Sequence, residues 1–96
     1  AVVLESVEIE PLVDMVISAH SLPARAKMMH TGVELNAPAC LAEPMLLMSV
    51  LDNLYSNAVH YGTESGNIYI RSNTNGSRVF IDVANTGTPI PDDEKP

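Results

Sequence analysis

The sequence of 96 residues contains one cysteine, no tryptophan, one phenylalanine and three tyrosines. With Cys40 as its only cysteine, the chain can form neither an internal disulfide nor a cysteine-based metal site, which fits a reducing compartment. Because aromatic side chains are so few, aliphatic residues and the five methionines must fill the core. A chain of this length forms one domain at most, and its core is expected to be thin.

Basic residues are also scarce, because 5 lysines and arginines stand against 12 acidic residues and give a net charge of −7. This charge repels phosphate backbones and anionic lipid headgroups, so neither a nucleic acid partner nor direct membrane contact is expected. No apolar run reaches the length of roughly 18 residues that a membrane span needs, and no signal peptide is recognisable. An acidic chain can still bind a nucleotide where backbone N–H groups and a divalent cation balance the phosphate charge.

The hydrophobic pattern of the first part of the chain predicts short strands around a helix. Residues 1–10 are expected to form a connector or first strand. A helix should begin at Pro11, bend at Pro23 and resume over residues 24–29. Thr31-Gly32 should end it, and two short strands should follow, at residues 33–36 and 40–41.

The strongest helical pattern covers residues 45–61, with Glu43-Pro44 at its start and Gly62 as its stop. Two strands are then expected at residues 67–73 and 78–84, joined by a tight turn in which Asn75-Gly76 supplies the positive φ angles. A Gly- and Pro-containing loop follows, and residues 92–96 resemble the start of another helix.

A helical wheel of residues 45–61 predicts two distinct faces. The buried face should contain Leu47, Val50, Leu51, Leu54 and Ala58. Beside it lies a polar stripe formed by Asn53, Asn57 and His60, with Tyr61 between the two and with Asp52 and Ser56 toward solvent. Asparagine is a poor helix former, so this stripe indicates a polar edge that lines a site, although a plain surface placement fits the spacing equally well.

The surrounding motifs resemble those of a known family. The helix contains Asn53-Leu54-x-x-Asn57-Ala58-x-x-Tyr61, which resembles the N box of sensor histidine kinases. The loop after the hairpin reads Val83-Ala84-Asn85-Thr86-Gly87-Thr88-Pro89-Ile90-Pro91, which resembles their G1 box. The order of the two motifs and the hairpin between them also match the family.

The resemblance implies an α/β (α+β) two-layer sandwich, the Bergerat-type ATP-binding fold, in which a mixed β-sheet carries helices on one face. Residues 11–96 would form part of such a domain, with the N box at residues 53–61 and the G1 box at residues 83–91. The ATP lid and the G2 box of the family have no counterpart in the sequence, so the domain would be incomplete at its C-terminus.

The resemblance also implies ATP and Mg²⁺ as cofactors. The family residue that matches Asn57 coordinates magnesium through its side-chain carbonyl oxygen, the kind of ligand that magnesium prefers. By the same matching, the nucleotide would contact Asn53, Asn57, His60, Tyr61, Asn85, Gly87 and Ile90.

Three positions depart from the family pattern. Asn85 replaces the usual aspartate that accepts the adenine amino proton, so the hydrogen bond can persist but loses its charge assistance. Pro89 replaces the second glycine of the G1 box and removes both backbone freedom and an N–H. His60 replaces a frequently basic phosphate contact and is only partly charged near neutral pH.

The implied function is that of a two-component sensor histidine kinase, whose parent protein phosphorylates a histidine of its own dimerisation domain and then a response regulator. This segment would be a cytoplasmic part of a membrane-bound homodimer, and none of its histidines matches the phosphoacceptor. It would be inactive by itself because the γ-phosphate would be poorly held without the lid. No residue is assigned a catalytic role except, as a candidate, Asn53. Because Asn53 is not a carboxylate, it cannot activate water as in the related ATP hydrolases.

Two alternatives remain open from the sequence. One is a degenerate module of the same fold that regulates or binds other proteins without binding nucleotide. The other is a serine kinase of the anti-sigma-factor type. His20 and His30 lack companions at metal-ligand spacing, and ordinary structural roles are expected for them.

Overall fold

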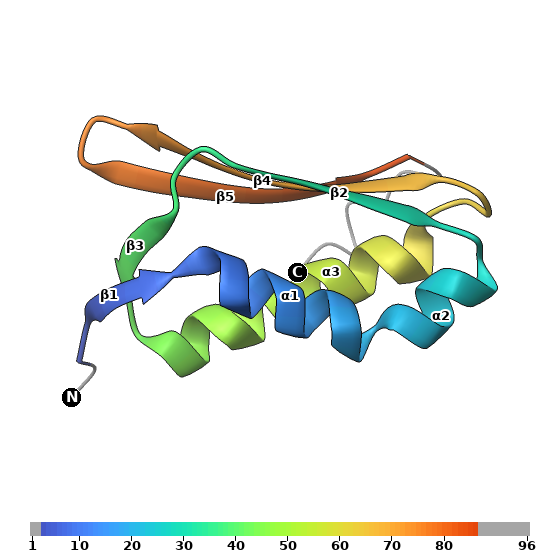
Figure 1. The fold of residues 1–96 in the computed structure, drawn as a ribbon, viewed down its shortest axis with the longest axis horizontal. Helices are drawn as coiled ribbons and strands as arrows, with labels where there is room; N and C mark the ends of the chain where they lie inside the picture. The colour runs from blue at the N-terminus through green and yellow to red at the C-terminus, as the bar shows by residue number, and fades with distance from the viewer. Residues whose placement is uncertain (1–2, 87–96) are drawn as a thin grey trace, which may run out of the picture.

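The computed structural model describes residues 3–86, which form a sheet with helices on one of its faces (Figure 1). In chain order the elements are β1 (Glu5–Glu8), α1 (Ile9–Ala19), α2 (Ser21–Ala26), β2 (His30–Leu35), β3 (Ala39–Ala42), α3 (Pro44–Tyr61), β4 (Asn67–Asn75) and β5 (Arg78–Asn85). The two-layer α/β fold expected from the sequence is confirmed.

The sheet is mixed, as predicted. Its three-stranded part has the order β2-β4-β5, in which β2 runs parallel to β4 and β4 runs antiparallel to β5. The strands β1 and β3 form a separate antiparallel pair at one end of the molecule (Figure 1). Both α1 and α3 lie beneath the three-stranded part, so one face of that sheet is covered.

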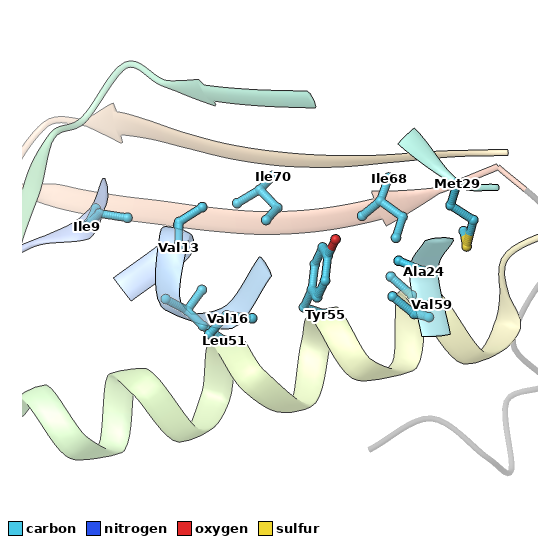
Figure 2. Packing of buried hydrophobic residues seen from close by; sticks show 11 residues of the cluster. Ile9, Val13, Val16, Ala24, Met29, Leu51, Tyr55, Val59, Ile68 and Ile70 are labelled. Atoms are coloured by element: carbon cyan, nitrogen blue, oxygen red, sulfur yellow. The ribbon is translucent and has the colours of Figure 1, made fainter. Parts of the chain in front are cut away.

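The core lies between this sheet and the helices (Figure 2). On α1 the residues Ile9, Val13 and Val16 are buried, at the three- and four-residue spacing of one helix face. On β4 the alternate residues Ile68, Ile70 and Ser72 are buried, as expected of a strand that is covered on one side. Aliphatic side chains dominate this core, as the scarcity of aromatic residues predicted.

The break between the first two helices lies at His20, so the predicted bend at Pro23 is wrong. His20 ends α1 and precedes α2, while Pro23 lies in the first turn of α2, where a missing N–H leaves no helical hydrogen bond unmade. The second helix ends at Ala26, short of the predicted residue 29. Met28 then adopts a φ of 54°, which a continuing helix does not permit.

The prediction that Thr31-Gly32 ends a helix is wrong, because both residues lie inside β2. The strand begins at His30 because its backbone pairs with β4 from His30 opposite Asn67 onward. This pairing joins residues far apart in the sequence, and it outweighs the turn-forming tendency of a local Thr-Gly pair.

The predicted helix over residues 45–61 is confirmed as α3, but its buried face is rotated from the expected one. The buried residues are Leu51, Tyr55, Ala58 and Val59. Val50, predicted to be buried, is 53% exposed, whereas Asp52 and Ser56, predicted to face solvent, are half-buried. The rotation arises because Tyr55 points into the core, where its hydroxyl lies 2.7 Å from Thr31 Oγ1 of β2.

The predicted hairpin is also confirmed, with its turn shifted by one residue. Asn75 pairs with Arg78, so the two turn residues are Gly76 and Ser77. Only Gly76 has a positive φ, of 64°, rather than both Asn75 and Gly76. A glycine at the first turn position satisfies the backbone of a type II′ hairpin turn.

Ser72 secures the connection that leads from β2 to β3. Its hydroxyl donates to the carbonyl of Ala37 at 2.6 Å and accepts from the backbone N–H of Ala37 at 3.1 Å. Because Ser72 is fully buried, Ser72→Ala is expected to destabilise the fold by about 1–3 kcal/mol, the penalty for buried polar groups left unpaired. Denaturant unfolding checks this, with the exposed Ser77→Ala in the hairpin turn as the control. Equal stability of the two variants would contradict the assigned role.

Candidate functional site

The helix α3 is fixed at both of its ends. At its start the carboxylate of Glu43 accepts a hydrogen bond from the backbone N–H of Leu46 at 2.7 Å, and Pro44 lies in the first turn. At its end Lys27 Nζ donates to the carbonyl oxygens of Val59 and His60 at 2.7 and 2.9 Å. A cation at these free carbonyls also interacts favourably with the helix dipole. The helix is therefore a rigid platform for the polar side chains along it.

Asn53 and Asn57 lie on the side of α3 that faces away from the core. Asn53 is exposed and Asn57 is half-buried, one helical turn apart. Among residues 3–86, neither side-chain amide forms a hydrogen bond with another residue. The oxygens of both amides are therefore available to a ligand.

His60 and Tyr61 end the same helix, and their rings meet edge to face with centroids 4.7 Å apart. His60 is exposed and also lines a hollow of about 240 Å³ between α2 and α3, together with His20 and Lys27. His60 therefore lies near a positively charged ammonium group, on the α2 side of the platform.

The end of β5 is bonded to the segment that follows α3. The backbone of Thr86 donates to the carbonyl of Asn67 at 2.9 Å and accepts from the N–H of Thr63 at 3.2 Å, while its hydroxyl accepts from the N–H of Asn67 at 2.8 Å. Asn85, which is half-buried and opposite Ile68, is thereby held near the C-terminal end of α3. The structure thus brings the start of the predicted G1 box close to the predicted N box. Gly87, Pro89, Ile90 and the helix start expected at residues 92–96 lie outside the described residues.

Gly66 lies close to both Thr63 and Thr86. A Cβ atom at this position would lie 2.8 Å from the hydroxyl oxygen of Thr86 and 2.9 Å from the backbone oxygen of Thr63. We expect Gly66→Ala to push these segments apart and to destabilise the fold by about 1–3 kcal/mol, as overpacking does. Gly32→Ala is the matched control, since a Cβ there would meet only the Tyr69 ring at 3.5 Å. Thermal unfolding distinguishes the two, and a Gly66→Ala variant as stable as the control would contradict the close approach.

The polar pair formed by His20 and Asp52 was missed from the sequence. His20 Nε2 lies 2.7 Å from a carboxylate oxygen of Asp52, and the ring centroid of His20 lies 5.9 Å from that of Tyr55. These partners are 32 residues apart in the chain, so no local spacing indicates the contact.

Other reactive groups in the described part of the chain are few. Desolvation by burial raises the pKa of the Cys40 thiol, which therefore stays protonated near neutral pH. Within residues 3–86, no three His, Cys, Asp or Glu side chains gather into a possible metal site. Nor does any helix in this range have both the length and the apolar character of a membrane span.

Comparison with known proteins decides the family. A model of the "Histidine kinase-, DNA gyrase B-, and HSP90-like ATPase" family matches residues 42–96, which is more than half of the chain. The chain belongs to this ATPase family. The matched residues include α3 with Asn53 and Asn57, the hairpin and the predicted G1 box.

Within this family the similarity is to sensor histidine kinases. The chain is 76% identical over 95 residues to the sensor histidine kinase GlrK of Escherichia coli (strain K12), and the match covers 99% of this chain and 20% of GlrK. The chain therefore spans about a fifth of the length of this curated relative. The similarity to sensor histidine kinases is therefore established for this part of their length.

Solved structures agree with the assignment of the fold. The catalytic domain of the histidine kinase ThkA superimposes with a TM-score of 0.82 at 25% identity, over 94% of this chain and 63% of that one. Full-length ShkA in complex with AMPPNP superimposes with a TM-score of 0.81 at 29% identity, over 97% of this chain and 20% of that one. The described residues therefore share the fold of histidine kinase catalytic domains.

Proposed function

We propose that the parent protein is a sensor histidine kinase that binds Mg-ATP at the face of α3 carrying Asn53 and Asn57. The observation that carries this proposal is the arrangement of an N-box helix beside the strand end at Asn85, in a chain that is 76% identical to a sensor histidine kinase. The AMPPNP complex of ShkA supports an adenine nucleotide as the ligand.

The residues present fit a magnesium nucleotide. Asn57 would hold the metal through its amide oxygen, because magnesium is bound by oxygen ligands. The half-buried side chain of Asn57 is available for this contact. Asn53, one turn earlier, would approach the phosphates and the metal. Bound magnesium would neutralise charge on the β- and γ-phosphates.

Adenine and ribose contacts would come from the other end of the site. The Asn85 amide oxygen would accept a hydrogen bond from the adenine amino group, held in place by the bonds of Thr86 to the loop after α3. Gly87 and Ile90 would continue this contact. Tyr61 would pack beside the nucleotide, and His60 would contribute a phosphate contact.

The proposed reaction is phosphoryl transfer to a histidine in a separate dimerisation domain of the same homodimer. An imidazole nitrogen of that histidine forms the new N–P bond, the bond between the γ-phosphorus and the β-γ bridging oxygen breaks, ADP leaves, and the imidazole loses a proton. The phosphoryl group then passes to an aspartate of a response regulator. Asn53, with no proton-accepting group near neutral pH, is suited to transfer rather than to hydrolysis.

The degenerate module is the second candidate, because Asn85, Pro89 and His60 all depart from the family pattern. A serine kinase of the anti-sigma-factor type is less favoured, since the relative at 76% identity is a sensor histidine kinase.

The chemical stability of the phosphorylated product separates these possibilities. The complete protein incubated with ATP and magnesium is expected to carry a phosphoryl group that is stable to base and labile to acid, as a phosphoramidate is. A phosphate stable to acid would indicate serine and contradict the proposal, and no phosphorylation or nucleotide binding would favour the degenerate module.

A further inference from the structure

The short helix α2 is joined to α3 by the residues at its own two ends. His20 is the residue before its first turn, and Lys27 is the residue after its last. Both side chains reach α3, since His20 Nε2 lies 2.7 Å from Asp52 Oδ1 and Lys27 Nζ donates to the carbonyls of Val59 and His60. The segment from His20 to Lys27 therefore forms polar contacts with α3 at two separate places.

These two contacts hold the solvent-facing side of the helix pair. On the inner side Ala24 and Val59 belong to the buried core (Figure 2). On the outer side the hollow of about 240 Å³ separates α2 from α3, lined by His20, Pro23, Lys27, Ser56, Val59 and His60. The buried side chains of α3, Tyr55 among them, fix which face of the helix meets the sheet, and beside the hollow the two polar contacts add a further restraint on its position.

The two contacts bracket the candidate nucleotide-binding residues. Asp52 directly precedes Asn53, and Val59 follows Asn57 by two positions. A slip of α3 by one residue would move each asparagine by about 1.5 Å along the axis and about 100° around it. Displacements of this size have large effects on positioned chemistry.

We infer that His20 and Lys27 are positioning residues, which add to the core packing of Tyr55 and hold the rotation and the axial position of α3 so that Asn53 and Asn57 face the nucleotide. This inference rests on the proposed binding of Mg-ATP at those asparagines. His20 acts through Asp52, and Lys27 acts through the last carbonyls of the helix. Neither side chain needs to touch the nucleotide.

The test measures the affinity of the complete protein for a nonhydrolysable ATP analogue with magnesium by calorimetry. His20→Ala and Lys27→Met are each expected to weaken binding about 3- to 10-fold, since each removes one restraint of about 1 kcal/mol on α3. Lys27→Met keeps the length of the side chain and removes only the ammonium group, so it remains informative if His20→Ala folds poorly. His20→Ala, Asp52→Ala and the double variant that combines them are expected to bind the analogue with similar affinity, because each change removes the same contact.

Conservative variants distinguish positioning from a general loss of stability. His20→Gln retains a donor toward Asp52 and Lys27→Arg retains donors toward the carbonyls, so both are expected to restore most of the affinity. The NMR signals of the Asn57 side-chain amide should shift in His20→Ala and Lys27→Met and return in the conservative variants. Arg71→Ala is the matched control, because it removes an ion pair of 2.9 Å with Asp82 on the opposite face of the sheet.

The outcomes separate this inference from the proposed function. If the unaltered protein binds the analogue and the His20 and Lys27 variants bind it equally well, the positioning role is wrong and the proposed function stands. If the unaltered protein does not bind the analogue, the proposed function fails and the inference fails with it.

Discussion

Asn57→Ala in the complete protein is expected to weaken the binding of Mg-ATP by about 100-fold, which corresponds to about 2.7 kcal/mol. The change removes the only side-chain oxygen at this position, so the magnesium ion would lose its proposed protein ligand and the charge of the phosphates would be less well balanced. Binding of the analogue without magnesium should change little, because the adenine contacts at Asn85 remain. Calorimetric titration with and without magnesium measures both effects.

Ser49→Ala is the control for this experiment, since Ser49 is an exposed residue of the same helix and lies two turns before Asn57. It should bind the nucleotide as the unaltered protein does. An Asn57→Ala variant that keeps the magnesium-dependent affinity would remove Asn57 from the metal site. Asn53→Ala would then be the next position to examine.

Tyr55→Ala is expected to destabilise the fold by about 3–5 kcal/mol, the range for removing a large aromatic side chain from a core. Tyr55 is 1% exposed and lies between α3 and the sheet, where its hydroxyl meets Thr31 (Figure 2). Tyr55→Phe removes only that hydrogen bond and should lower the stability by about 0.5–1.5 kcal/mol. The free energy of unfolding from denaturant titration checks both values.

Tyr69→Ala serves as the control for Tyr55, because Tyr69 lies on the uncovered face of the sheet and is 43% exposed. Its loss should lower the stability by much less. If Tyr55→Ala and Tyr69→Ala had equal effects, the core would not be centred where the structure has it.

Local patterns predicted the elements whose signals are contained in their own residues. The start of α3 follows from Glu43-Pro44, and the strands of the hairpin follow from alternation on either side of a turn with glycine. Gly62 was expected as a helix stop, and α3 does end before it, but with a φ of −70° rather than a left-handed conformation. A Cβ at Gly62 would lie 2.7 Å from the carbonyl oxygen of Ala58, so close approach explains the glycine better than backbone conformation does.

Features that depend on long-range contacts were not predictable in this way. The start of β2 at His30 depends on pairing with β4, and the rotation of α3 depends on Tyr55 reaching Thr31. The helical wheel placed Val50 in the core, and only the contact between Tyr55 and Thr31 shows which face of α3 the sheet covers. The break at His20 was missed because Pro23 is the stronger local signal, although a proline is well accommodated in a first helical turn.

The candidate site was found through motif order rather than through geometry. Asn53 and Asn57 are four residues apart, a spacing that any exposed helix face can show, and the hairpin and the Asn85 segment gave that spacing its meaning. The contacts of His20 and Lys27 with α3 could not be predicted, because both residues lie more than thirty positions from their partners in the sequence. The sequence therefore predicts which residues would meet a nucleotide, whereas the contacts of His20 and Lys27 with α3 are seen only in the structure.

Calorimetric titration of the complete protein with a nonhydrolysable ATP analogue, in the presence and in the absence of magnesium, tests the central claim most directly. The face of α3 is proposed to bind the nucleotide through a magnesium ion held by Asn57, so we expect saturable binding that weakens when magnesium is removed. Binding that is undetectable at millimolar analogue, or binding that is indifferent to magnesium, would contradict this account.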